Sequence, residues 1–526
     1  MNKSLTFLCL WLWALAAQAQ MDTTATKFAQ TITQADLKAH LEVLASDAYE
    51  GRETGTAGQK KAAQYIRQAF ASYALAGIVP AAVSQDPYLQ PFALEKSKYG
   101  SFRLAGKGKV ELQLLQDFFS IQGLLTEQRK AKMVFAGYGM DTDKYSDYQN
   151  IDPQGKVLVV LMGEPKDSAG IYLATGTKQK SIASQPDKKI AVAKEKGGLG
   201  VILLYESNEI LENVLTNYAD YFSQPRLGFP DPDKTFALYS APERVASLFG
   251  KQKAKFNAYL EALLKDPTNV PAKAPQAKIT LLPKASIEKV GSENVLAFLE
   301  GTDKKDEILV ITAHYDHIGI SPNGEINNGA DDDGSGTVAV LEMAQAFAAA
   351  KAAGHGPRRS ILFMTVSGEE KGLLGSEYYS DNPILPLHQT ITNLNIDMIG
   401  RVDPKYEDEN NPNYIYIIGS NMLSDSLHRL SERTAAAYGE VSLDYRYNDK
   451  DDPNRFYYRS DHYNFAKHNI PVIFYFNGTH ADYHKPSDTV EKIHFPKMEK
   501  VARLIFLTAW QIANQEERIT PDKLNR

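Results

Sequence analysis

The chain has 526 residues, of which 43% are hydrophobic and 23% are charged, and its formal net charge is -6. This length exceeds one ordinary domain, so we expect two or three domains, and the apolar fraction argues against disorder. The mildly acidic balance, without a basic domain or a long Lys/Arg run, excludes nucleic acid as the main partner.

The N-terminal stretch MNKSLTFLCLWLWALAAQAQ predicts a secretory signal peptide over residues 1–19. Lys3 precedes an apolar run from Leu5 to Leu15, and an A-x-A cleavage site ends at Ala19. A membrane anchor is the alternative, but the run is much shorter than the ~20 residues of a spanning helix. We therefore expect export to the periplasm or beyond, without stable membrane insertion. The only cysteine, Cys9, lies in this leader, so the mature chain has neither disulfides nor thiolate metal sites.

Residues 20–109 begin with two helical patterns, TQADLKAHLEVLAS and GQKKAAQYIRQAFASY. In the first pattern Thr33 is a possible cap, and Leu37, Leu41 and Leu44 follow at helical spacing. The linking stretch DAYEGRETGTAG is polar and rich in glycine, which is typical of a loop.

Residues 110–285 have a different sequence pattern, with short apolar runs typical of strands, such as KMVFAGYGM, KVLVVLMG and GVILLY. One helical stretch, KKIAVAKEKGG, lies among them, and LLKDPTNVPAKAPQAK resembles a linker. This region is expected to form a separate, mostly β domain with few helices.

Residues 286–526 alternate compact apolar runs with helical patterns. The apolar runs occupy 307–313, 360–366, 392–399, 413–418 and 471–476, and the helical patterns occupy 337–351, 421–437 and 496–514. This alternation predicts an α/β fold with a mostly parallel central sheet covered by helices on both faces. Ligands of such sheets bind beyond the carboxyl ends of the strands.

Ionisable residues follow several of these predicted strands. His314 and Asp316 in HYDHIG share a face, so the carboxylate of Asp316 is placed to accept the second ring N–H of a metal-bound His314. Glu369 and Glu370 follow the next strand in VSGEEKGLLGS, where one side chain can bind a metal while the other faces a substrate. A polar loop and a solvated acidic surface are the alternatives.

Asp397 lies within an apolar strand, where a carboxylate needs a cation or several hydrogen bonds. His484 follows the last strand, and His480 is a nearby competitor. The strand ends together supply His314, Asp332, Glu370, Asp397 and His484. A ligand set of nitrogen and oxygen suits zinc, with manganese and cobalt as lesser candidates. Five ligands exceed one tetrahedral ion, and two metals ~3.5–4 Å apart with a bridging carboxylate accommodate them.

The ordered motifs HYDHIG, NGADDDGSG, GEEKGLLGS, NIDMIG, YRSDHYNF and YHKPSDT resemble those of the secreted co-catalytic di-zinc aminopeptidases. This family includes bacterial leucyl aminopeptidases, glutamate carboxypeptidase and the transferrin receptor. The stretch LASDAYEGRETGTAGQKKAA also resembles the family, and residues 110–285 look like its inserted protease-associated domain. The resemblance covers nearly all of the mature chain and implies a peptidase domain built from residues 20–109 and 286–526.

Carried over to this sequence, the family pattern implies two zinc ions per chain with a bridging Asp332. The implied ligands are His314, Asp332 and Asp397 for one ion and Asp332, Glu370 and His484 for the other. The peptide bond after the bridging aspartate is typically cis in the family, so a cis bond is expected between Asp332 and Asp333. Asp333 is expected either to take part in the cis peptide bond that orients Asp332 or to support the metal ligands through hydrogen bonds.

Glu369 matches the general base of the family. Tyr457 or Tyr458 is a candidate donor to the substrate carbonyl, and Arg401 and Arg459 are candidates to hold a substrate carbonyl or carboxylate. Structural ion pairs are the alternative for both arginines, and His317 and His462 are expected to have structural or supporting roles.

The resemblance implies a peptidase that removes N-terminal residues from peptide substrates. A carboxypeptidase or a peptidase acting on acidic or modified substrates stays open, as do a glutaminyl-cyclase-like activity and a catalytically dead binding protein on this scaffold. The complete set of ligands, together with the base, favours an active enzyme. The sequence predicts neither the preferred side chain nor the oligomeric state.

Overall fold

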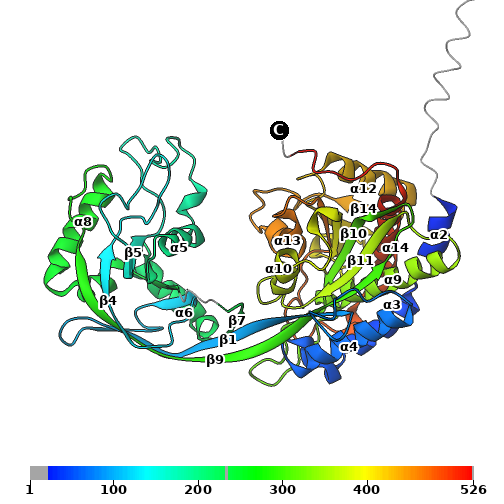
Figure 1. The fold of residues 1–526 in the computed structure, drawn as a ribbon, viewed down its shortest axis with the longest axis horizontal. Coiled ribbons are helices and arrows are strands. Elements are labelled where there is room, and N and C mark those ends of the chain that lie inside the picture. The colour runs from blue at the N-terminus through cyan, green and yellow to red at the C-terminus, as the bar shows by residue number, and fades with distance from the viewer. Residues whose placement is uncertain (1–21, 231–234, 524–526) are drawn as a thin grey trace, which may run out of the picture. The chain divides into compact units, whose positions relative to one another are not determined.

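The computed structural model describes residues 22–230 and 235–523, so the predicted signal peptide lies outside the described residues (Figure 1). Among the described residues, no helix is long and apolar enough to cross a membrane. The chain divides into two compact units, one made of residues 1–93 and 290–526 and the other of residues 94–289. We call them unit 1 and unit 2.

Unit 1 is built on a sheet with the strand order β14-β13-β15-β12-β10-β11-β9. Its strands are β10 (Lys304–His314), β11 (Arg359–Val366), β12 (Thr390–Ile396), β13 (Tyr414–Ile418), β14 (Ser442–Asp444), β15 (Val472–Phe476) and the C-terminal part of β9 (Gln276–Leu299). Strands β11, β10, β12 and β15 run parallel, whereas β9 and β13 are antiparallel to their neighbours β11 and β15. The predicted, mostly parallel α/β sheet is confirmed.

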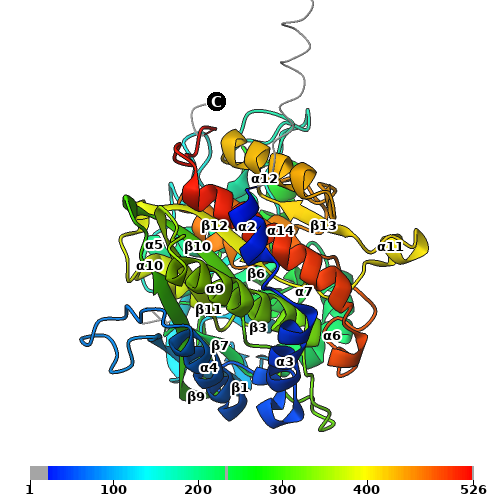
Figure 2. The ribbon, with the colours of Figure 1, turned by 90° about the vertical axis from the view of Figure 1, so that its right-hand side faces the viewer.

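Helices cover both faces of this sheet. One face carries α2 (Thr23–Ala29), α3 (Gln34–Leu44), α4 (Ala57–Ser72), α9 (Gly336–Ala352), α12 (Asp425–Tyr438) and α14 (Phe495–Asn514), most of which are seen in Figure 2. The other face carries α10 (Leu374–Asp381), α11 (Pro404–Asp408) and α13 (His462–Ala466). Each face has its own hydrophobic core, because strands buried on both sides need apolar partners above and below.

Helix α9 is buried along nearly its whole length, since twelve of its 17 residues are buried. Its sequence GTVAVLEMAQAFAAAKA is apolar on almost every side, as is typical of a helix enclosed by other elements. It packs against α2, α3 and α4 and directly follows the aspartate-rich loop. The loop is therefore anchored to a rigid element.

In unit 2 the hydrogen-bonded strands follow the order β9-β4-β5-β6-β8-β3, and β1 pairs with β9, β2 and β7. Its strands are β1 (Leu89–Ala105), β2 (Glu111–Gln113), β3 (Phe119–Gln122), β4 (Arg129–Phe135), β5 (Lys156–Leu161), β6 (Gly200–Leu204), β7 (Arg226–Gly228), β8 (Phe236–Ser240) and the N-terminal part of β9. Its helices are α5 (Pro186–Glu195), α6 (Asn208–Ser223), α7 (Pro242–Val245) and α8 (Lys253–Lys265).

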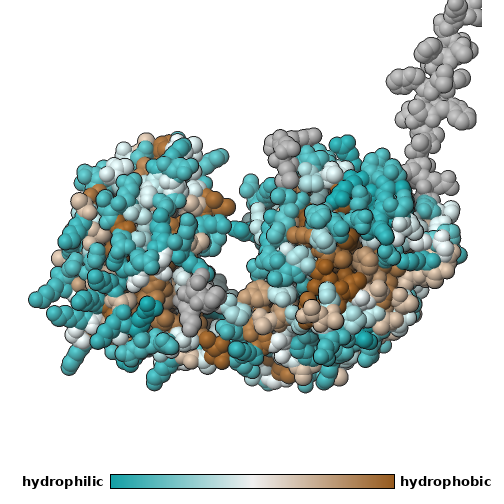
Figure 3. Space-filling view, in the orientation of Figure 1, coloured by the Kyte–Doolittle hydropathy of each residue, from teal (hydrophilic) through white to brown (hydrophobic). Residues whose placement is uncertain are grey.

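Unit 2 differs from the expectation in two respects. The sequence predicted one helix, which is α5, and the structure adds α6, α7 and α8. Helix α6 buries only Leu211 and Leu215, and such sparse apolar positions hide a helical period among polar residues. The unit also begins at Leu94 rather than at residue 110, because β1 pairs with β2 and β7 inside it. The visible face of each unit is mostly hydrophilic, with smaller hydrophobic patches (Figure 3).

Candidate metal centre

The carboxyl ends of the parallel strands in unit 1 bring the predicted ligands together. Strand β10 ends at His314, Asp397 follows β12, and Glu370 lies in the turn after β11. The loop after β15 adds His484. Parallel strands place their carboxyl ends at one edge of the sheet, so residues far apart in sequence meet there.

Asp332 lies between two groups of side chains and offers one oxygen to each. Its Oδ1 lies 3.4 Å from His314 Nε2, and its Oδ2 lies 3.0 Å from His484 Nε2. His314 Nε2 is also 3.6 Å from Asp397 Oδ1, and His484 Nε2 is 3.1 Å from Glu370 Oε2. This is the arrangement expected of a carboxylate that bridges two cations.

His317 is a further candidate ligand that sequence reasoning placed outside the metal centre. Its Nδ1 lies 2.8 Å from Glu370 Oε1 and 3.8 Å from Asp332 Oδ2. Two groups of side chains therefore have ligand atoms close enough to hold an ion: His314, Asp332 and Asp397, and His317, Asp332 and Glu370. His317 and His484 approach the second group from different sides, with their ring centroids 5.7 Å apart.

The buried charges of this cluster fit cations. Asp332 Oδ2 is buried and accepts no hydrogen bond from any described residue. Burial alone would raise the pKa of Asp332, but the neighbouring imidazoles of His314 and His484 hold that pKa well below its usual range. Burial opposes protonation of His484, yet Asp332 and Glu370 raise its pKa to about 10. The carboxylates thus draw positive charge to the site, and a buried carboxylate cluster of this kind is stable with bound cations.

Asp331 holds the loop from behind. Its Oδ1 accepts hydrogen bonds from Gly400 N at 2.6 Å and from Ser335 Oγ at 2.9 Å. Its Oδ2 lies 3.3 Å from His480 Nε2. His480, the competitor of His484, therefore pairs with a loop aspartate rather than with the bridging carboxylate.

Asp333 ties the loop to the sheet and to α9. Its carboxylate accepts hydrogen bonds from Gly336 N and Met398 N, both at 2.9 Å, and from His314 N at 3.2 Å. The peptide bond between Asp332 and Asp333 is cis, as predicted. Asp333 thereby fixes the backbone beside three candidate ligands while its own carboxylate faces main-chain amides.

Asp488 supports the loop from the other side and was not among the predicted residues. Its Oδ2 accepts hydrogen bonds from Asp331 N at 3.0 Å and from Asp332 N at 3.2 Å. Arg401, a substrate candidate, has its Nη2 2.8 Å from Asp482 Oδ2 and its Nη1 3.8 Å from Asp488 Oδ1. These contacts agree with the structural ion pairs that the sequence left open as the alternative for Arg401.

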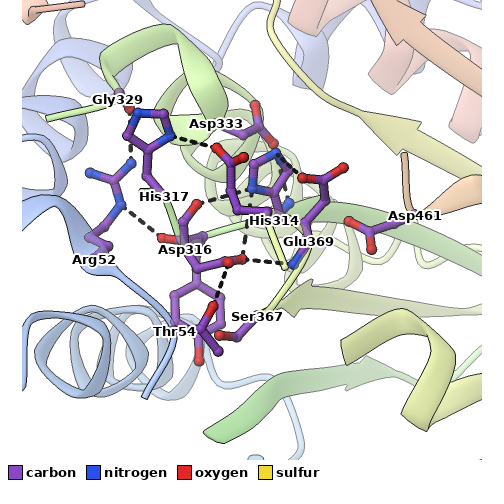
Figure 4. A network of polar contacts seen from close by, with 12 residues as sticks. Arg52, Thr54, His314, Asp316, His317, Gly329, Asp333, Ser367, Glu369 and Asp461 are labelled. Atoms are coloured by element: carbon purple, nitrogen blue, oxygen red, sulfur yellow. Dashed lines mark hydrogen bonds and ion pairs between the residues drawn. The ribbon is translucent and has the colours of Figure 1, made fainter. Parts of the chain in front are cut away.

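Arg52 underlies the centre and explains the N-terminal GRETG motif. Its guanidinium is fully buried, and Figure 4 shows it directed toward Gly329. It donates hydrogen bonds to four carbonyls, those of Tyr315 and Leu44 at 2.8 Å, Asn328 at 2.6 Å and Gly329 at 2.9 Å. One side chain therefore joins α3, the HYDHIG turn and the aspartate-rich loop.

The carboxylate of Asp316 binds the turn that carries Glu369 rather than the ring of His314. The Nδ1 of His314 lies 3.0 Å from the main-chain oxygen of Asp316 and 3.8 Å from its carboxylate. That carboxylate accepts hydrogen bonds from Thr54 Oγ1 at 2.7 Å and from Glu369 N at 3.3 Å (Figure 4). The main-chain oxygen of Asp316 therefore takes the place beside the His314 ring that was expected for its carboxylate.

Glu369 lies beside the ligand cluster. Its side chain is 11% exposed, and its Oε2 is 3.9 Å from His314 Nε2. Together with Asp332 and Asp397 it lines a small hollow of about 30 Å³. Burial raises the pKa of Glu369 well above its usual range, so its carboxyl group can hold a proton. Asp461 lies on its far side, and burial raises the pKa of that carboxyl to about 7 (Figure 4).

The rest of the hollow is largely apolar. Its remaining lining residues are Met398, Phe456, Arg459, Phe474, Phe476, Thr479 and Tyr483. Tyr483 stacks on His484 with a centroid distance of 3.9 Å. Tyr457 and Tyr458 are not among the lining residues, since the ring of Tyr457 packs on His462 and that of Tyr458 on Tyr463.

The family model described as Peptidase family M28 matches residues 294–509. The probable leucine aminopeptidase of Arthroderma benhamiae is 28% identical over 250 residues, 45% of this chain and 64% of the relative. Aminopeptidase YwaD of Bacillus subtilis is 26% identical over 251 residues, 46% of this chain and 49% of the relative. The matched stretch thus spans less than two thirds of each relative's own length.

The fold also matches that of a solved structure. The aminopeptidase from Aneurinibacillus sp. strain AM-1 is aligned over 94% of this chain and 98% of its own, with a TM-score of 0.54 and 19% identity. At this identity the match shows a shared fold. The stretch that matches the model of peptidase family M28, residues 294–509, includes every candidate metal ligand.

Proposed function

We propose that the protein is a zinc aminopeptidase that hydrolyses the N-terminal peptide bond of peptides at a centre for two ions. One observation carries the proposal: the two oxygens of Asp332 face two separate ligand groups, with Glu369 beside them. The names of the two curated relatives, a probable leucine aminopeptidase and an aminopeptidase, support the same activity.

The first ion would be held by His314, Asp397 and the Oδ1 side of Asp332. The second would be held by Glu370, the Oδ2 side of Asp332 and His484, with His317 as a further donor to the same side. Zinc suits this set of imidazoles and carboxylates, and when bound it supplies Lewis acidity toward water and a peptide carbonyl.

Glu369 is the group placed to move the proton. Its carboxylate accepts a proton from the attacking water and then donates it to the leaving nitrogen. The raised pKa caused by burial suits this role, since the group must hold the proton between the two transfers. The hydrogen bond from its own main-chain N–H to Asp316 fixes the turn that carries it.

The lining of the hollow beside Glu369 supports a substrate with an apolar side chain next to the cleaved bond. Met398, Phe474 and Phe476 line it and offer apolar contact to a substrate side chain. We assign the exposed Arg459, which also lines the hollow, to a main-chain carbonyl of the substrate. An apolar N-terminal residue such as leucine is the expected substrate class.

A substrate panel tests this proposal. The mature protein is assayed on leucine-leading peptides with a free N-terminus, on the same peptides after N-acetylation, and on C-terminally amidated forms, with and without a chelator. We expect release only from free N-termini, no effect of C-terminal amidation, and loss of activity on chelation that zinc restores. Release of C-terminal residues from N-acetylated peptides would show a carboxypeptidase, and chelator-resistant cleavage would exclude a metal mechanism.

We also propose that residues 1–19 direct export and that unit 2 is a protease-associated domain. The apolar leader with its A-x-A site supports the first, and the motifs quoted above support the second. N-terminal sequencing of protein recovered outside the cytoplasm tests export, with Gln20 expected as the first residue.

A further inference from the structure

Unit 2 contains a hollow of about 440 Å³ that is separate from the residues of the metal centre. Its lining includes residues of β1, β3 and β7 and of the C-terminal end of α6. Its apolar lining residues include Leu114, Ile121, Leu124, Phe222, Leu227 and Ile287. Hollows of this size and character are typical of small-molecule sites.

Arg226 places a positive charge in this apolar lining. Its guanidinium donates a hydrogen bond to the main-chain oxygen of Ser120 and forms no ion pair with a carboxylate of the described residues. Burial lowers the pKa of Arg226, and the groups that oppose this shift are the phenols of Tyr221, Tyr99 and Tyr239. A partly buried cation that forms no ion pair with the described residues is costly, which favours an anionic ligand.

Two hydroxyl groups lie beside the guanidinium. Ser120 is 3% exposed and lines the hollow, and its Oγ is buried without a hydrogen-bond partner among the described residues. The Tyr99 hydroxyl accepts a hydrogen bond from Leu125 N at 2.7 Å, so its own hydrogen is available to a further acceptor. The lining thus combines three donor groups, Arg226, Ser120 and Tyr99, with several apolar side chains.

We propose that this hollow binds a single carboxylate carried on an apolar group, held by Arg226, Ser120 and Tyr99. A peptide C-terminus with an apolar last residue and a medium-chain fatty acid share this chemistry. Glu95 and Lys98 also line the hollow and carry opposite charges, so Arg226 leaves one net positive charge there, which suits a single carboxylate better than a phosphate or another multiply charged anion. Glu95 and Arg226 lie on the same face of the β1–β7 pair, since Ser97 is paired with Arg226 and Glu95 with Gly228.

The site is independent of the proposed peptidase function, because none of its residues belongs to unit 1. The experiment is calorimetric titration of the mature, zinc-loaded protein with two pairs of probes. The pairs are N-acetyl-phenylalanine with its amide, and decanoate with decanamide. Each amide keeps the apolar group and removes only the charge.

We expect each acid to bind at least roughly tenfold more tightly than its amide, as charge-assisted hydrogen bonds predict. Arg226→Gln is expected to abolish this acid-dependent binding event. The matched control Arg129→Gln, at an exposed arginine of the same unit, is expected to retain it. A carboxylate bound at the metal centre would persist in Arg226→Gln, so this variant separates the two locations. Ser120→Ala, which removes only one donor, is expected to weaken acid binding several-fold and serves if Arg226→Gln does not fold.

Tighter binding of N-acetyl-phenylalanine than of decanoate would indicate a peptide C-terminus, and the reverse order would indicate a fatty acid. Both outcomes support the carboxylate site. Equal affinity for acid and amide, no acid binding, or an acid preference that survives intact in Arg226→Gln would overturn the proposal.

Discussion

Single residues explain why three consecutive aspartates are stable in one buried loop. Asp332 faces two histidines, Asp331 accepts from Gly400 and Ser335, and Asp333 accepts from main-chain amides. Each carboxylate therefore has a different set of partners. The repulsion among the three negative charges is offset because hydrogen-bond donors stabilise Asp331 and Asp333, while Asp332 faces the proposed ions.

The sequence predicted a metal ligand where an ionisable residue interrupts an apolar strand, as Asp397 does. It did not predict Asp488, because hydrogen bonds to main-chain amides leave no pattern in the sequence. It also set His317 aside, although its place three residues after His314 was a usable signal. It named Tyr457 and Tyr458, whereas Tyr483 is the tyrosine that lines the hollow.

His462 makes the stability of unit 1 depend on pH. Full burial lowers its pKa from the ordinary 6.5 to about 3, so below pH 6.5 the unfolded chain binds a proton that the folded chain does not. Stability contributed by the neutral ring is therefore present above pH 6.5 and falls as the pH decreases, by about 1.4 kcal/mol per pH unit.

The variant His462→Phe keeps a ring against Phe474, whose centroid lies 4.7 Å away. Between pH 7.5 and 5.5 we expect it to lose about 1.4 kcal/mol less unfolding free energy than the wild type, measured by urea unfolding. His388→Phe, at an exposed histidine, is the control and is expected to behave like the wild type. An identical loss in His462→Phe and wild type would contradict this assignment.

Among the elements, the aspartate-rich loop and helix α9 act as one rigid support. The loop begins with Ala330, runs directly into Gly336 at the start of α9, and contacts β12 through Asp333 and Met398. Continuous apolar strands such as β10 and β11 were predicted from sequence because burial on both faces leaves no polar alternation. Helix α6 of unit 2 was missed because its few buried leucines are separated by polar residues.

Gly336 is a position at which this support has no room for a side chain. An added Cβ would lie 2.4 Å from Ile396 O and 2.5 Å from the Asp333 carboxylate oxygens. Gly336→Ala must therefore displace the backbone beside Asp332 and Asp397, and we expect zinc affinity to fall roughly 10- to 100-fold. Metal content after dialysis against a competing chelator measures this.

Gly291→Ala is the matched control for that experiment. A Cβ at Gly291 meets no described heavy atom within 4 Å, and its φ lies outside the left-handed region. We expect wild-type zinc affinity in this variant. Unchanged affinity in Gly336→Ala would show that the loop can shift without disturbing the ligands.

For the whole molecule, the two units have separate hydrophobic cores, and the metal centre belongs to one of them. Zinc bound to the folded state alone stabilises that unit by about 2.7 kcal/mol at a hundred times its Kd. We therefore expect two unfolding transitions, of which chelation lowers only one midpoint.

Trp510 makes this measurable, since Trp11 and Trp13 lie in the leader and Trp510 is buried in unit 1. Its fluorescence is expected to follow the transition that moves on chelation, while circular dichroism also detects a second transition that does not move. A single transition, coincident in both signals and shifted as a whole, would show that the units unfold together.

The most direct test of the proposed mechanism is Glu369→Gln. Glu369 is absent from both groups of close ligand atoms, so the variant is expected to retain the zinc content of the wild type. Its kcat on a leucine-leading peptide is expected to fall roughly a hundred- to ten-thousandfold, because the general base is lost. Glu370→Gln, the neighbouring control, is expected to lose zinc as well as activity. A Glu369→Gln protein that keeps its zinc and more than a tenth of the wild-type kcat would contradict the account.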